Sequence, residues 1–127
     1  MAESIHAAGG ALDITLVSQW DLSGKQYFGV ISSPDADLNT RISSLAGTNI
    51  VGIVQNKPQS GRPARVRIYG ESKAVAGTAI TRGTRVDVDA GGYMRTAVSS
   101  NYAGIALKTV VASATFTMIV NPQYAGA

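Results

Sequence analysis

The sequence has 127 residues but no cysteine and only one histidine, and these two shortages exclude much of protein chemistry. Without cysteine there is no disulfide, no thiolate metal site, no iron–sulfur cluster and no thiol nucleophile. One histidine cannot build a multi-histidine metal site, and His6 lies in a glycine-rich stretch that offers it no orienting partner. We therefore expect no catalytic residue, no metal and no cofactor, and the protein is predicted not to be an enzyme.

Charged residues and long apolar runs are also scarce. Charged residues make up 15% of the chain and apolar residues 45%, which is typical of a folded domain and not of a disordered tail. No apolar run approaches the roughly 18 residues that span a bilayer, and the N-terminus lacks the features of a signal peptide. We expect a protein that is made in a cytoplasm and does not enter a membrane.

Two regions differ in composition. Residues 1–11 are small and glycine-rich, which predicts a flexible N-terminal arm that becomes ordered only on a partner. Residues 12–127 contain eight or nine short β-rich segments separated by turn signals about every ten residues, which predicts one β domain. Because no helix-sized segment separates these strands, a βαβ fold is excluded. The fold class is all-β, a single compact sandwich or barrel-like domain with at most one short helix.

That helix would fall in residues 35–45. Leu38, Ile42 and Leu45 follow helical spacing and would share one face of a helix. The segment is too short to be stable as an isolated helix. It predicts one or two helical turns, or a loop with apolar anchors.

Strand alternation is clearest in two places. In residues 64–70, Val66 and Ile68 fall on one face and three polar or aromatic residues on the other: Arg65, Arg67 and Tyr69. Residues 73–76 predict a separate short strand, and residues 85–98 predict a hairpin around a Gly-Gly turn. In the last strand, Phe116 and Met118 should point inward.

The polar residues allow more than one interpretation. Arg65, Arg67 and Tyr69 combine bases with an aromatic ring, as in single-strand nucleic-acid binders. We favour the simpler interpretation that the arginines pair with acids on a neighbouring strand or chain. Asp87 and Asp89 are spaced for one strand face, where a cation site is conceivable and a solvated hairpin face near Arg85 is simpler.

Charge is unevenly divided along the chain. Residues 1–55 hold two bases and five acids, whereas residues 56–127 hold nine bases and three acids. The basic half could face phosphate or an acidic protein surface. Because the arginines are spread out and not run together, solvated strand faces are the interpretation we favour.

The order of the glycines and strands in residues 51–120 resembles the small capsid cement, or head decoration, proteins of tailed bacteriophages. A glycine-led apolar stretch, Gly52 to Gln55, precedes the Asn-x-Pro loop of Asn56, Lys57 and Pro58. An alternating strand, an Ala-Ile…Gly segment, a Val…Asp…Gly hairpin and a Gly-x-Ala-Leu strand then follow in residues 64–107. A β-rich strand at residues 115–120 closes the pattern.

The resemblance implies a non-enzymatic virion protein. It would bind the major capsid protein on the outer surface of an assembled head and bridge neighbouring capsomers, as a homotrimer at three-fold positions. The alternative is a small β module that binds nucleic acid through its basic strand. Trp20 could be an interface anchor or a core residue. The candidate contacts with the capsid or between subunits are Ile5, His6, Trp20, Asn56, Lys57, Arg65, Arg67 and Tyr69.

Overall fold

The computed structural model describes residues 11–43, 45–98 and 101–123, and in these ranges it contains nine strands and no helix. The strands are β1 (Leu12–Ser18), β2 (Gly29–Ser32), β3 (Asn39–Ile42), β4 (Gly52–Val54), β5 (Pro63–Val75), β6 (Arg85–Val88), β7 (Met94–Thr96), β8 (Tyr102–Ala106) and β9 (Thr115–Gln123). The all-β prediction is confirmed. Within the same ranges there is also no helix long and apolar enough to cross a membrane.

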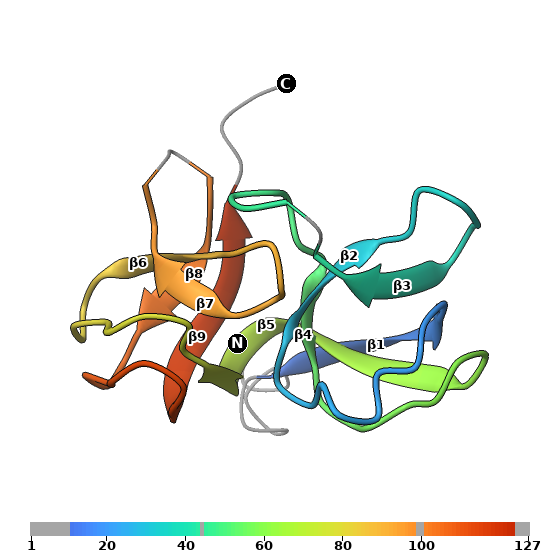
Figure 1. Cartoon of the computed structure of the whole chain (residues 1–127), viewed down its shortest axis with the longest axis horizontal. Helices are drawn as coiled ribbons and strands as arrows, with labels where there is room; N and C mark the ends of the chain where they lie inside the picture. The colour runs from blue at the N-terminus through green and yellow to red at the C-terminus, as the bar shows by residue number, and fades with distance from the viewer. Residues whose placement is uncertain (1–10, 44, 99–100, 124–127) are drawn as a thin grey trace, which may run out of the picture.

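The strands form two lobes that share β5 (Figure 1). The first lobe is a closed barrel in the order β1-β3-β2-β4-β5, because β5 pairs back with β1. The second lobe continues from the C-terminal half of β5 in the order β5-β9-β8-β6-β7. Its last strand, β7, reaches the residue after β5 through a bridge between Met94 and Ala76.

The 13-residue strand β5 changes partners at Gly70. Residues before Gly70 pair with β1 and β4, and residues from Gly70 onward pair with β9. Gly70 has φ of 109°, a backbone conformation that favours glycine. The separate short strand expected at residues 73–76 is therefore wrong, since Lys73 to Val75 are the end of β5.

Alternation along β5 is unbroken by this kink. Ala64 and Val66 are buried in the barrel, and Ala74 is buried in the second lobe. Arg65, Arg67 and Tyr69 share the outer face, as the alternation predicts. One strand thus supplies an apolar face to both cores and a polar face to solvent.

Each lobe has its own core. The barrel core consists of Leu22, Phe28, Val30, Ile42, Val54, Ala64 and Val66. The second core is larger and includes Ile53, Val86, Val88, Met94, Phe116, Met118 and Val120. The inward positions predicted for the hairpin and for the last strand are confirmed.

The helix expected within residues 35–45 is absent from the described residues. Asn39 to Ile42 form β3, which pairs with β2 and with β1. Leu38 has a left-handed φ of 59° and is 75% exposed, so its apolar side chain does not join a helical face. Of Leu38, Ile42 and Leu45, only Ile42 is buried. Strand pairing on both edges of β3 outweighs the weak helical preference of this segment.

The two lobes touch through the turn between β6 and β7. The N–H of Gly29 on β2 donates to the carbonyl of Gly92 at 2.8 Å. The Phe28 and Tyr93 rings pack edge to face with centroids 4.7 Å apart. A Cβ on Gly29 would lie 2.9 Å from a Val88 methyl group, so the close approach needs glycine there.

Two strand glycines leave no room for a side chain, which gives a first prediction. A Cβ on Gly52 would lie 2.1 Å from the Arg67 carbonyl oxygen, and one on Gly104 would lie 1.8 Å from that of Ile119. Gly52→Ala or Gly104→Ala should therefore lower the free energy of unfolding by at least about 2 kcal/mol, measured by urea denaturation.

Gly24→Ala is the matched control, because its Cβ would meet no atom within 4 Å. It should change stability by less than about 0.5 kcal/mol. Equal stability of all three variants would show that strands β4 and β8 do not need this close approach.

Candidate interaction surfaces

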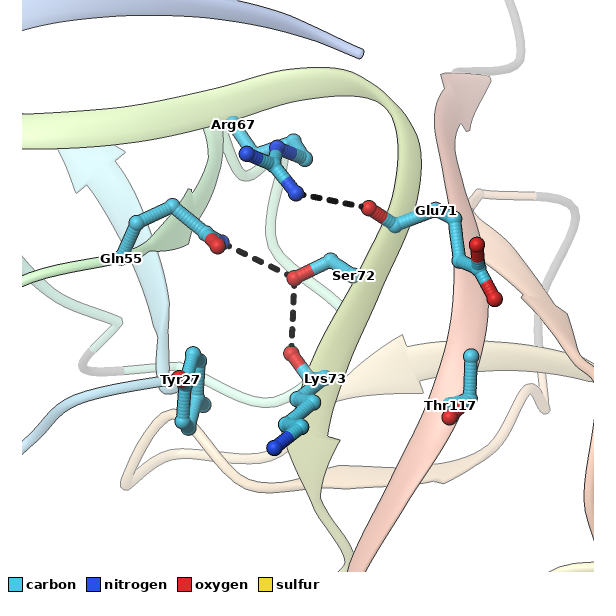
Figure 2. Close-up of a pocket in the computed structure, with 7 residues that line it drawn as sticks. All are labelled: Tyr27, Gln55, Arg67, Glu71, Ser72, Lys73 and Thr117. Carbon is cyan, nitrogen blue, oxygen red and sulfur yellow. Dashed lines mark hydrogen bonds between the residues drawn. The ribbon is translucent and has the colours of Figure 1, made fainter. Parts of the chain in front are cut away.

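A polar pocket lies beside the kink of β5 and has a volume of about 280 Å³. Figure 2 shows its lining residues: Tyr27, Gln55, Arg67, Glu71, Ser72, Lys73 and Thr117. The buried Gln55 side chain donates to the Ser72 hydroxyl at 2.9 Å, and that hydroxyl donates to the Lys73 carbonyl at 2.8 Å. The Ser72 hydroxyl therefore bonds structural groups and not a base, so this arrangement does not activate a nucleophile.

Arg67, at one side of this pocket, is held by an acid on the neighbouring strand β1. Its guanidinium donates to both oxygens of Asp13, at 2.8 and 3.1 Å, and to the Glu71 carbonyl at 2.9 Å. Arg65 lies 3.3 Å from the same carboxylate. The interpretation that these arginines pair with an acid on the next strand is thus confirmed, and Arg67 has little capacity left for a phosphate.

The Asp13–Arg67 pair also perturbs the acid. The hydrogen bond from Arg67 lowers the pKa of Asp13 below its ordinary value of 3.8, with the nearby Arg65 charge acting in the same direction and partial burial against it. The ionised form of Asp13 is therefore favoured by folding.

The carboxylates of the β6–β7 hairpin are structural. Asp87 is buried and accepts from Arg95 Nε at 2.6 Å, so the solvated position expected for it is wrong. Asp89 Oδ1 accepts from the backbone N–H groups of Gly91 and Tyr93 and so fixes the turn. In the ranges that the structure describes, no group of three or more acidic or histidine side chains could hold a metal ion.

Trp20 lies on the surface of the barrel and not in its core. Its side chain is 42% exposed, and the Arg41 guanidinium stacks 4.9 Å from the ring centroid. Arg41 is in turn 3.4 Å from Asp35. Backbone pairing of Val17 with Asn39 brings two more exposed apolar residues, Val17 and Leu38, to this region. We call Val17, Trp20 and Leu38 the barrel patch.

The loop at residues 56–62 lies against the segment that carries Trp20. Ser60 donates to the Gln19 carbonyl, and the Gly61 N–H donates to the Ser18 carbonyl. Asn56 bridges the loop, since it accepts from the Arg65 N–H and donates to the Pro63 carbonyl. Asn56 thus has a structural task, while the Lys57 side chain is exposed.

The predicted contact residues that the structure describes lie on one lobe only. The six within the described ranges all lie in the barrel: Trp20, Asn56, Lys57, Arg65, Arg67 and Tyr69. Ile5 and His6 lie outside the described residues.

The second lobe also exposes apolar side chains that do not stand out in the sequence. Ile105, Leu107 and Ile119 point outward from the β8–β9 region and are each about 40% exposed. Alternation next to Met118 would have placed Ile119 outside.

Folding also redistributes the charge. The described residues from 11 to 69 form the barrel with six bases and four acids, and the described residues from 70 to 123 form the second lobe with five bases and three acids. The contrast between an acidic and a basic half of the sequence therefore disappears, because β5 carries its arginines into the barrel.

A family model described as phage cement protein matches residues 8–122. The chain belongs to the phage cement protein family. This cement protein is a capsid-associated structural component of a phage virion, and the resemblance seen in the glycine pattern is confirmed. No curated protein matches its sequence.

The cement protein also has a similar solved structure, the N base of the head fibre gp8.5 of bacteriophage phi29. The TM-score is 0.70 at 15% identity, covering 87% of this chain and 94% of that one. At this identity the likeness establishes a shared fold.

The pKa of Asp13 gives a second prediction. A carboxylate whose pKa is lowered by folding contributes its full stabilisation at pH values above its ordinary pKa of 3.8. This contribution is lost as the pH falls below 3.8 and through the lower pKa of the folded state. Asp13→Asn should lower the free energy of unfolding near pH 7 by about 1 kcal/mol and should flatten its decline below pH 3.8, measured by urea denaturation across pH.

Asp37→Asn is the control, because Asp37 is exposed and has no ion pair among the described residues. It should keep the wild-type pH profile. An unchanged profile for Asp13→Asn would contradict a stabilising role for the Asp13–Arg67 pair.

Proposed function

We propose that the protein binds the outer surface of an assembled capsid, as a homotrimer at three-fold positions, and stabilises the head by bridging neighbouring capsomers. The family match over residues 8–122 carries the proposal. The resemblance discussed above adds the major capsid protein as partner and synthesis in the cytoplasm of a bacterial host. A cement protein acts by binding alone, so we infer no catalytic step.

The distribution of exposed apolar side chains supports a bridging role. A bridge needs at least two contact surfaces on one assembly. Each copy supplies one barrel patch, so a homotrimer carries three of them. Strand β5 joins the lobes, and the contact at Gly29 and Gly92 holds them together.

The physical effect would be mass action. A ligand that binds only the assembled shell stabilises that shell by RT ln(1 + [L]/Kd). Repetition of the same contact at many symmetric sites multiplies a modest energy per site. Forces that pull capsomers apart would then be opposed at each junction.

Co-sedimentation with isolated undecorated heads tests this function directly. Saturable binding, together with a higher temperature of head opening, is the expected result. Heads that neither retain the protein nor gain stability would contradict the proposal.

The barrel patch gives a third prediction. Trp20 is the largest exposed apolar side chain there, and tryptophan is enriched among residues that dominate binding energy. Trp20→Ala should weaken retention on heads by roughly tenfold or more, whereas the fold should persist because the ring is outside both cores. Val98→Ala, at an exposed residue after β7, is the control and should bind as the wild type does.

The N-terminal arm gives a fourth prediction. Deletion of residues 1–11 removes the segment expected to order on a partner but keeps β1, which begins at Leu12. The truncated protein should keep its thermal unfolding transition and bind heads more weakly. Unchanged binding would refute a role for the arm.

A further inference from the structure

The outer face of the second lobe carries a row of four residues in direct cross-strand register. Glu71 on β5 pairs with Ile119 on β9, Ile119 with Ile105 on β8, and Ile105 with Arg85 on β6. All four side chains are exposed. The row therefore presents an acid, two adjacent isoleucines and a base, in that order.

Neither charged end of the row has an ion-pair partner among the described residues. Glu71 and Arg85 are separated by two strands, about 14 Å at a strand spacing of about 4.8 Å, which is too far for a pair within the chain. Arg85 is nonetheless held in place, since its guanidinium stacks 4.8 Å from the Tyr102 ring centroid. Because its side chain is already ordered, Arg85 loses less conformational entropy when it pairs with an incoming acid.

The apolar centre extends beyond the two isoleucines. Leu107 follows β8 directly and is 42% exposed, and its N–H donates to the carbonyl of Thr117 on β9. Three neighbouring side chains that each expose about two fifths of their surface form a patch that association would bury with a gain of free energy.

We propose that this face is the contact between copies of the chain, with Ile105 and Ile119 of three copies packed around the three-fold axis and Glu71 of each copy paired with Arg85 of the next. The proposal rests on the trimer in the proposed function. The acid and the base lie on opposite sides of the apolar pair, so a cyclic arrangement brings unlike charges together at every junction.

Three copies can share one apolar centre. In a closed ring each row contributes its two isoleucines to the axis, and the charged residues lie at the three junctions between copies.

Charge reversal tests the contact, with the trimer dissociation constant measured by analytical ultracentrifugation. Glu71→Arg or Arg85→Glu places like charges at every junction and should raise that constant at least about tenfold. The double variant E71R/R85E restores unlike pairs and should return close to the wild-type value. Asp37→Arg and Arg62→Glu reverse exposed charges on the barrel and should have no effect.

The possible outcomes separate the two proposals. A wild-type trimer that neither reversal weakens would overturn this contact and leave the proposed trimer intact. A wild-type monomer, in solution and on heads, would overturn the trimer itself. The wild-type protein could instead be a dimer that either single reversal weakens and the double variant restores. That result would replace the three-fold arrangement with face-to-face pairing of two copies. Charge-reversal variants that lose head binding but keep the trimer would show that this face contacts the capsid and not another copy of the chain.

Discussion

The structure depends on one continuous strand that belongs to two sheets. Strand β5 closes the barrel with its first half and starts the second lobe with its second half, and it changes partners at Gly70. Because its alternation survives the kink, one face feeds both cores while the other stays polar. The two lobes are therefore tied together both by the covalent chain and by packing.

Glycine is the second constraint, and its role differs from the turn chemistry that the sequence suggests. Gly52 begins β4 and Gly104 lies within β8, and at both positions a neighbouring carbonyl occupies the space of a side chain. Both belong to the cement-protein pattern, since Gly52 opens its first apolar stretch and Gly104 opens its Gly-x-Ala-Leu strand. Their order along the chain is informative because each marks a place where two neighbouring strands approach unusually closely.

Predictions from residue patterns succeeded where a property depends on adjacent residues. The hairpin of β6 and β7, the inward Phe116 and Met118 and the outer face of β5 all follow from period-two alternation. The helix prediction was wrong because the spacing of Leu38 and Ile42 carries no information about β1 and β2, the two strands that pair with residues 39–42. Asp87 was misplaced because its burial depends on Arg95, which lies opposite it in the hairpin.

The sequence by itself determined the all-β class, the strand faces and the family, since these depend on local alternation and on the order of turn and strand glycines. Only the tertiary structure decided which charges are available, because Asp13 meets Arg67 across 54 positions of the chain. It also decided which apolar side chains remain outside. The row from Glu71 to Arg85 exists only through the register of four strands, which distant hydrogen bonds fix and no local pattern encodes.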